Sequence, residues 1–585
     1  MRGAPFFGPS RVILASFALA SLLADAGCKK KEAPPEAKKE AVAPETAVPA
    51  PDGMVAEGIM KSPDAIMASL RTISPIIPDK AAPILADVLH VNRVVADEID
   101  GQRPAFFVMA RKGETSLYVF AAPIKDASKV GAELVKLGMS RMEDNTLGLS
   151  VFEGGATPGG PRTQVLGIRR NFLLAATSVQ ALKDLAPYAT RSLPLKPVPT
   201  QEIAVTVPQS AVRGALRDAF KGMIDAGTAK RKELLAKAKS APQKTPVGLM
   251  DAVGDYATRQ NERMLGWLAD AGDAHVTLST TGGSVTLKAD VAAVVPDSVF
   301  GKTIASWPLG DSGPALDVPI GAVLAFVGRS GEVQRTESSR DLLEMLVGTF
   351  PDDIQSKEKE KIAEFLAAWD KARADLTSGA LLYEGPSRLG VGLRIGAKDP
   401  AALAKLLETA LTSVLGMKGV TAGLEKQGIG KPTLSKEKIG GIEANVLSLK
   451  LPHPNGEKPK PGEPETAEIV WAQNGTTVDL AAGVGARELF QRVVEAKAEK
   501  SLRTYPEVVK RLEALGNELG GALLGVPSRV VPLSTGSPVV APTPPGDLVV
   551  LAMGKNAQGP FVSLDLSRGA VEVFGRLAMQ TMAKK

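Results

Sequence analysis

The sequence predicts an α+β protein with an internal duplication, in which antiparallel sheets are covered by helices and helical pairs. Three observations lead to this prediction. Short runs of alternating apolar and polar residues are separated by amphipathic helical segments. The same motifs occur twice, in one order, along the 585 residues. Hydrophobic residues make up 44% and charged residues 23%, which are ordinary values for a globular body and exclude a disordered chain.

The first 27 residues have the pattern of a secretion signal. Arg2 and Arg11 supply positive charge, and residues 12–24 form an apolar stretch. That stretch is shorter than the roughly 20 residues that a permanent membrane-spanning helix needs. We therefore expect residues 1–27 to be a signal peptide.

Cys28 is the only cysteine of the chain, and the small residues Ala26 and Gly27 come directly before it. This arrangement resembles the lipobox of bacterial lipoproteins, in which the thiol is lipidated and the cysteine becomes the first residue. The resemblance implies lipid attachment at Cys28. Asp25 departs from the family pattern, which usually has an apolar residue there. Ala24-Asp25-Ala26 also fits an ordinary signal-peptidase site, which leaves a soluble secreted or periplasmic protein as the alternative.

Residues 28–52 are expected to form a lipidated cysteine followed by a flexible linker. After Cys28 the segment is rich in Lys, Glu, Pro and Ala and has no aromatic residue, so it has little apolar surface to bury. By resemblance to well-studied lipoproteins, Lys29 in place of Asp favours the outer membrane, facing the periplasm or the cell surface.

The body begins with a short strand and a helix near residues 55–70, and its clearest repeated motif follows. Residues 119–134 and 392–407 each read as an alternating strand that ends in Lys-Asp and leads into an amphipathic helix. Asp126 and Asp399 are suited to be N-caps, and Pro400 suits the first helical position. Further paired motifs follow in the same order, at 171–186 and 476–493, at 191–193 and 500–502, and at 203–210 and 522–529.

These matches predict two repeats, 53–308 and 309–585, each with a strand, a helical pair, hairpins and closing helices. The helical pairs are expected at 209–270 and 337–377, and the Gly282-Gly283 turn predicts a hairpin. We expect the sheets to be covered on one face. The repeated pattern resembles a broad group of uncharacterised bacterial envelope proteins. The resemblance implies no activity, because none is established for that group.

Candidate catalytic and metal-binding residues are isolated in the sequence. His90, His275 and His453 are far from one another, and no zinc-ligand spacing such as HExxH or CxxC occurs. Ser435 and Lys438 match Ser-x-x-Lys but lie in a highly charged segment. The acidic groups at 97–100 and 352–353 lack the spacing of a calcium loop. We predict no catalytic residues, no cofactor and no metal.

Two glycine motifs are weak matches to nucleotide loops. Gly301-Lys302-Thr303 lacks the first glycine of a phosphate loop, because Pro296 stands there. Gly483 and Gly485 precede a helix, but Glu488 replaces the third glycine of a dinucleotide loop and would repel a pyrophosphate. We interpret both motifs as local turns. Gly390, Gly392 and Gly396 lie in one strand and indicate crowding of the backbone or a bulge.

The charge balance argues against nucleic acid as a partner. The net charge is +6, but 70 basic residues are interspersed with 64 acidic ones, and aromatic residues make up only 4%. We therefore predict a non-enzymatic, membrane-anchored envelope lipoprotein that binds or scaffolds an unknown envelope protein, with the membrane contacted through acyl groups on Cys28. The long loops 153–162 and 452–465 are the expected contact surfaces. The alternatives are a periplasmic carrier of a lipid or other apolar ligand and, more weakly, a hydrolase with an unrecognised site.

Overall fold

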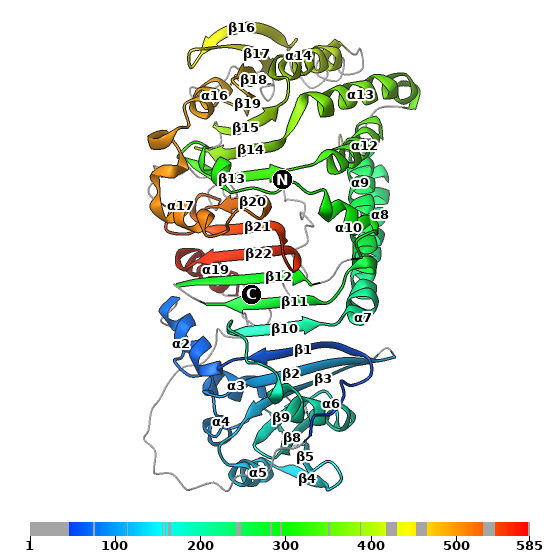
Figure 1. Ribbon diagram of the computed structural model, residues 1–585, viewed down its shortest axis with the longest axis vertical. Helices are drawn as coiled ribbons and strands as arrows, with labels where there is room; N and C mark the ends of the chain where they lie inside the picture. The colour runs from blue at the N-terminus through cyan, green and yellow to red at the C-terminus, as the bar shows by residue number, and fades with distance from the viewer. Residues whose placement is uncertain are drawn as a thin grey trace. The chain divides into compact units, whose positions relative to one another are not determined.

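The structure is a computed structural model that describes most of the chain after residue 45 (Figure 1). The described ranges are 46–73, 77–89, 91–113, 115–154, 156–157, 160–161, 165–240, 247–280, 283–292, 295–348, 352–385, 388–416, 430–451, 465–530 and 545–582. The predicted signal peptide and Cys28 lie outside these ranges. Among the described helices, none is long and apolar enough to cross a membrane.

Packing of the chain defines two compact units. Unit 1 runs to Ala211 and includes His275–Thr286, and unit 2 contains Val212–Ala274 and the chain from Leu287 onward. This division follows spatial contacts, whereas the predicted boundary between 308 and 309 follows repeated sequence motifs. The repeat boundary therefore stays a prediction.

Unit 1 contains an antiparallel sheet in the strand order β10-β1-β2-β3-β9-β8-β5-β4. The strands are β1 Met54–Met60, β2 Ala105–Lys112, β3 Thr115–Pro123, β4 Met139–Asp144, β5 Leu149–Gly154, β8 Val165–Arg169, β9 Phe172–Ala176 and β10 Ile203–Val207. Short strands β6 Ala156–Thr157 and β7 Gly160–Pro161 pair with each other within the predicted loop 153–162. The helices are α2 Pro63–Ile73, α3 Ala82–Leu89, α4 Arg93–Asp97, α5 Ala127–Lys136 and α6 Val179–Arg191.

The sheet of unit 1 is buried on both faces, so the prediction of cover on one face is wrong. Successive residues of β9 enter opposite hydrophobic clusters: Leu174 packs with the residues of α6, and Leu173 packs with those of α4 and α5. Side chains alternate between the two faces of a strand, and here both faces are apolar. Helices from different parts of the unit therefore cover both sides.

Unit 2 contains a sheet in the order β22-β21-β20-β13-β14-β15-β19-β18-β17-β16, again antiparallel throughout. The strands are β13 Ala322–Arg329, β14 Arg373–Tyr383, β15 Leu389–Ala397, β16 Thr433–Ile439, β17 Ile442–Lys450, β18 Thr466–Asn474, β19 Thr477–Gly483, β20 Leu519–Gly525, β21 Val549–Asn556 and β22 Gly559–Ser567. The longer helices are α8 Arg217–Ser240, α9 Val247–Asp270, α12 Glu332–Gly348, α13 Asp352–Ala372, α14 Pro400–Gly416, α16 Ala486–Val494, α17 Pro506–Glu513 and α19 Arg568–Met582.

This second sheet is also covered on both faces. On β18, Val470 and Ala472 belong to the cluster that contains residues of α16. Trp471, between them, is completely buried and donates from Nε1 to the Ala404 carbonyl of α14 at 3.1 Å. Helices α14 and α16 therefore lie on opposite sides of the sheet (Figure 1).

The two units share one pattern of strand pairing. The order β10-β1-β2-β3-β9-β8-β5-β4 corresponds, strand by strand in sequence order, to β20-β13-β14-β15-β19-β18-β17-β16. In both units one or more helices separate the first strand from the next hairpin, and α5 and α14 follow those hairpins.

The helical pairs form as the sequence predicts, with local differences. The first pair consists of α7 Gln209–Ala211, a π-helical turn at Val212–Leu216, α8 and α9. Val212 of this pair is buried, whereas Met223 is 41% exposed, so the apolar residues of the pair lie only partly in the core. The second pair ends at Ala372 and not at residue 377, because β14 begins at Arg373 and pairs with β15. The predicted hairpin residues lie in β11 Ala274–Ser279 and β12 Ser284–Val291.

The end of the predicted linker contacts unit 1. The Val48 amide donates to the Ser192 hydroxyl at 2.8 Å, and that hydroxyl donates to the Val48 carbonyl at 2.7 Å. Arg191 donates from Nε to the Thr46 carbonyl at 2.9 Å. Thr46 and Val48, which belong to the predicted linker, are thus attached to the end of α6.

Candidate functional site

A pocket of about 330 Å³ in unit 2 is the candidate functional site. It lies where α12, α13, α14 and the start of β14 meet. Ligand sites in proteins usually have volumes of about 300–1,000 Å³, so this pocket is large enough for a small ligand. Its lining residues are Ser338, Ser339, Phe365, Leu366, Trp369, Arg373 and Leu407.

Apolar side chains dominate the pocket. Phe365 and Trp369 lie one turn apart on α13, with ring centroids 6.0 Å apart and planes inclined at 37°. Leu366 is buried, and Leu407 reaches the pocket from α14. The spacing of four residues places both rings on one face of the helix. The arrangement therefore offers an aromatic and aliphatic surface to a ligand.

Polar groups border one side of the pocket. Asp370 accepts a hydrogen bond from the Ser339 hydroxyl and another from Arg373 Nε at 3.1 Å. The guanidinium of Arg335 pairs with Asp375. Burial lowers the pKa of Arg373, although the charge of Asp370 opposes this effect. These four described groups, two of each sign, thus lie at or near the pocket, and Arg373 is the one of them that lines it.

The corresponding region of unit 1, between α4 and α5, is filled. Val95, Val130 and Leu134 are completely buried in one cluster with Leu89. In sequence order α4 corresponds to α13, because each is the last helix before a strand hairpin, and α5 corresponds to α14. The helix interface of unit 1 therefore packs as a hydrophobic core.

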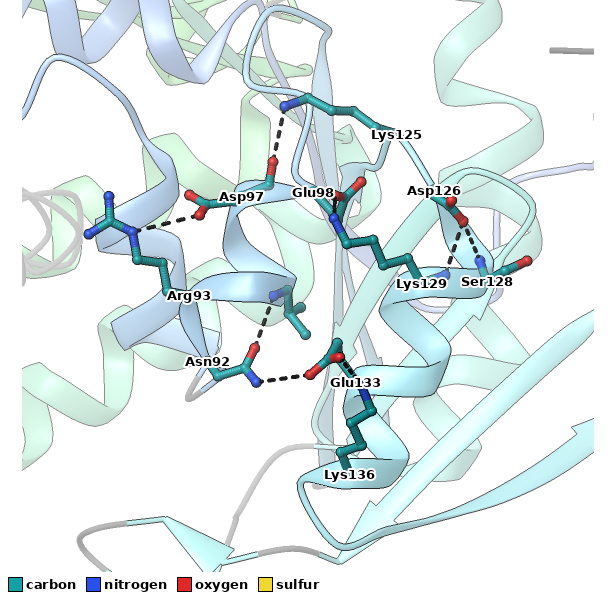
Figure 2. Close-up of polar contacts among 11 residues, drawn as sticks. Asn92, Arg93, Asp97, Glu98, Lys125, Asp126, Ser128, Lys129, Glu133 and Lys136 are labelled. Atoms are coloured by element: carbon teal, nitrogen blue, oxygen red, sulfur yellow. Dashed lines mark hydrogen bonds and ion pairs between the residues drawn. The ribbon is translucent and has the colours of Figure 1, made fainter. Parts of the chain in front are cut away.

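Polar contacts join α5 and the residues just before it to α4 and the residues that cap α4 (Figure 2). Lys125 Nζ donates to the Asp97 carbonyl at 3.0 Å, and Lys129 pairs with Glu98 at 2.5 Å. Its hydrogen bond with Glu98 raises the pKa of Lys129. Asn92 Nδ2 donates to Glu133 Oε2 at 3.5 Å. These side chains are used to hold elements together, which favours a structural role.

Both predicted aspartate caps are confirmed. Asp126 accepts from the amides of Ser128 and Lys129 at 2.9 and 3.0 Å (Figure 2). Asp399 accepts from the Ala402 amide at 2.9 Å, and Pro400 is the first residue of α14. The paired Lys-Asp motifs are therefore helix starts.

The candidate chemical residues are not brought together by the described fold. His275 Nδ1 lies 3.2 Å from the Thr206 hydroxyl, whereas His90 and His453 lie outside the described residues. Ser435 and Lys438 are exposed on β16, and the Ser435 hydroxyl contacts Glu437 at 3.0 Å. Within the described part of the chain, no group of three His, Cys, Asp or Glu residues is placed to hold a metal ion.

The glycine motifs have structural explanations. A Cβ on Gly301 would lie 2.2 Å from the Val295 carbonyl oxygen, so this glycine permits a close contact within the chain. Gly485, at a φ of +75°, is the N-cap residue of α16. Gly390 and Gly392 on β15 face Leu489 and Val493 of α16, where a Cβ would come within 2.6 and 2.5 Å. The predicted crowding in β15 is confirmed at Gly390 and Gly392, where its cause is α16. At Gly396 a Cβ would instead lie 3.0 Å from the Leu376 carbonyl oxygen of β14.

The predicted contact loops are described only in part. Of 153–162, the structure describes Glu153, Gly154 and the short pair β6–β7, and of 452–465 it describes residue 465. The side chains of Asp352 and Asp353 are also outside the description. Asp97 and Glu98 contact Arg93 and Lys129, respectively, as surface ion pairs.

The residues of the pocket were not predicted from the sequence. One signal was available: Phe365 and Trp369 are four residues apart on a predicted helix, in a chain with only 4% aromatic residues. Two aromatic residues at this spacing on a helix are equally compatible with a packed core. Only the positions of α12 and α14 leave part of this surface open.

Comparisons with known proteins identify no family. No family model matches the chain, and no curated protein matches it. Solved structures of TP0453 in crystal forms III and IV are 8% and 9% identical, with TM-scores of 0.21, and cover 41% of this chain and 77% of theirs. Crystal form I is 10% identical, with a TM-score of 0.19, and covers 46% of this chain and 98% of its own. Similarity at this level carries no argument about function.

Proposed function

We propose that this chain is a membrane-anchored envelope lipoprotein whose body is a non-catalytic binding module for an apolar ligand. The pocket beside Trp369 is the observation that carries the binding role. Its aromatic and aliphatic lining suits apolar surface, whose removal from water is favourable by about 25 cal/mol per Å². The carrier function is therefore preferred to scaffolding alone.

The membrane anchor rests on the residues around Cys28. The intact mass of the membrane-extracted protein, compared with that of Cys28→Ala, tests it. We expect the native chain to begin at Cys28 and to carry the added mass of acyl groups, and the variant to lack them. An unmodified chain that begins at Gly27 would instead support secretion as a soluble protein.

We infer that the body arose by duplication. The shared order of eight paired strands supports this inference, together with the Lys-Asp helix starts. A second correspondence is the serine that follows α6 in unit 1 and α16 in unit 2. Ser192 bonds to Val48 before β1, and Ser501 lies opposite Pro319 before β13. The interface between α4 and α5 of unit 1 is filled, whereas the corresponding region of unit 2 contains the pocket.

Binding of a neutral apolar probe tests the proposed pocket. 1-Naphthylamine, which is neutral at pH 7 and small enough for a pocket of this volume, should bind the wild-type protein and fluoresce more strongly, and Leu407→Trp should prevent binding because the larger side chain fills the pocket. Trp369→Ala should also weaken binding. Phe574→Ala, which removes an exposed aromatic ring of α19, is the matched control. Equal probe binding by Leu407→Trp and wild type would exclude the pocket as the binding site.

Scaffolding of an envelope protein is the second candidate, because the loops 153–162 and 452–465 occupy corresponding places in the two predicted repeats. A pull-down with both loops deleted tests it. Loss of a partner that the wild-type chain retains would favour scaffolding through these loops. Retention of every partner would exclude that surface.

A further inference from the structure

We propose that the ligand of the pocket is a small amphiphile with a carboxylate, held with its apolar part against Phe365 and Trp369 and its carboxylate against Arg373. This inference rests on the proposed function, and it adds the chemical class of the ligand. Four properties of the pocket lead to it: the available donors of Arg373, the charges around this residue, its burial and the volume of the pocket.

Arg373 has donors to spare. A guanidinium carries five N–H donors in a planar fork that matches a carboxylate. Its Nε donates to Asp370 at 3.1 Å, and among the described residues its terminal nitrogens have no other hydrogen-bond or ion-pair partner. The two terminal nitrogens are therefore available for a bidentate bond to a ligand.

The charges near the pocket favour an acidic ligand at this position. Of the described residues that line the pocket, Arg373 is the charged one. Asp370 already accepts from Ser339 and Arg373, and Asp375 is engaged by Arg335. A second cation, Arg335, is close enough to lower the pKa of Arg373 further, after the larger effect of burial. A bound carboxylate would compensate both effects, whereas an ammonium group would add to them.

Burial strengthens a hydrogen bond between Arg373 and a ligand carboxylate. The side chain of Arg373 is 18% exposed, so most of its guanidinium has lost water. Charge-assisted hydrogen bonds are about twice as strong as neutral ones, and solvent screens them less when they are buried. The pocket should therefore bind a carboxylate ligand measurably more tightly than a neutral ligand of similar size.

The volume limits the apolar part. At about 30 Å³ for each water-sized group, the 330 Å³ pocket holds roughly eleven non-hydrogen atoms. Octanoate has about that size, whereas a two-chain phospholipid is several times larger. The ligand class is thus a short fatty acid or an aromatic carboxylic acid.

Titration with octanoate, octanol and octylammonium tests the inference on the full-length protein. We expect octanoate to bind the wild-type protein at least about ten times more tightly than octanol, and octylammonium to bind least, by tryptophan fluorescence or calorimetry. Arg373→Gln should reduce the affinity for octanoate to that for octanol. Arg373→Lys should keep part of the preference, because it retains the charge without the fork. Lys405→Gln, an exposed cation on α14, is the matched control.

The outcomes separate the two proposals. Equal affinities for octanoate and octanol in the wild-type protein would overturn the carboxylate inference and leave the apolar pocket intact. A preference for octylammonium would do the same. Absence of binding by all three compounds and by the neutral naphthylamine probe would overturn the proposed function itself. Circular dichroism of each variant shows whether it is folded, and the wild-type comparison decides the inference even if Arg373→Gln does not fold.

Discussion

Buried ionisable side chains are neutralised by partners on neighbouring elements. Asp479 on β19 is completely buried, and Arg394 of β15 pairs with it at 3.0 Å. Asn474 Nδ2 donates to the same carboxylate at 2.7 Å, and Arg394 also donates to the Val493 carbonyl at 2.8 Å. An unpaired buried charge is costly, so these contacts explain how the sheet tolerates an aspartate in its interior.

Tyr188 and Lys196 should make the stability of the protein fall at alkaline pH. The Tyr188 hydroxyl donates to Glu57 at 2.7 Å, and burial and this bond raise the pKa of Tyr188 above its usual 10.0. Burial alone would lower the pKa of Lys196, but its hydrogen bond to Glu57 raises it overall. The fold thus favours protonated Tyr188 and Lys196. Their contribution to the free energy of unfolding is complete when the pH is below the pKa values of the unfolded state. It is lost as the pH rises through the pKa values of the folded state.

Urea unfolding between about pH 8 and about pH 11 measures this effect. We expect the free energy of unfolding of the wild-type protein to fall across this range, and that of Tyr188→Phe to fall less. Tyr118→Phe, on β3, is the control and should follow the wild type. The same decline in Tyr188→Phe and wild type would show that Tyr188 does not contribute.

At the scale of single elements, helix starts and helix–strand contacts have local causes. Asp126 satisfies two amides at the beginning of α5, and Asp399 satisfies one at the beginning of α14. Gly390 and Gly392 remove side chains from β15 where α16 packs closely. A cap depends on neighbours in the sequence, whereas the glycines serve a helix that follows almost 100 residues later.

Loss of the Asp126 cap should destabilise the protein modestly. Replacement of an N-cap Asp by Ala typically costs about 1 kcal/mol, and we expect that value for Asp126→Ala in urea unfolding. Asp126→Asn should remain close to wild type, because an asparagine oxygen accepts the same bonds. An Asp126→Asn variant as unstable as Asp126→Ala would show that charge, and not capping, is responsible.

A side chain at Gly392 should destabilise unit 2. The new Cβ of Gly392→Ala would lie 2.5 Å from Val493 Cγ2, and overpacking of this kind costs about 1–3 kcal/mol. Gly328→Ala on β13 is the control, because a Cβ there has no described atom within 4 Å. Thermal unfolding of both variants provides the comparison. Equal stability would mean that α16 moves away without cost.

At the scale of the whole molecule, charges connect helices that lie far apart in the sequence. Asp341 of α12 is 1% exposed and accepts from Gln260 and Arg263 of α9, both at 2.8 Å. Glu337 and Glu344 of α12 pair with Arg263 and Arg259 at 3.7 and 3.1 Å. This network joins the two predicted helical pairs within unit 2.

Asp341→Ala should separate α9 from α12. It leaves Arg263 partly buried without its main partner, and loss of one member of a buried ion pair typically costs about 3–5 kcal/mol. Hydrogen exchange should become faster in both helices. Asp225→Ala, which breaks an exposed pair with Lys221, should change the free energy of unfolding by less than about 0.5 kcal/mol. Unchanged exchange in Asp341→Ala would show that apolar packing alone holds the helices.

Much of the fold was predictable because its signals are local. The caps at Asp126 and Asp399, the strand–helix order and the helical pairs depend on residues within a few positions of one another. The helix predicted up to residue 377 ends at Ala372 instead, since residues from Arg373 onward pair with β15. Cover on both sheet faces was not predictable, because the covering helices come from distant segments.

Lipid attachment at Cys28 is predicted from the sequence alone, because a lipidation signal is a linear pattern that is read along an extended chain. Tertiary structure alone decided where a ligand can bind. Ser339, Trp369, Arg373 and Leu407 come from four separate elements, and no periodicity within any one of them indicates the others. A pocket is the space that packing leaves between elements, so it exists only once those elements are placed.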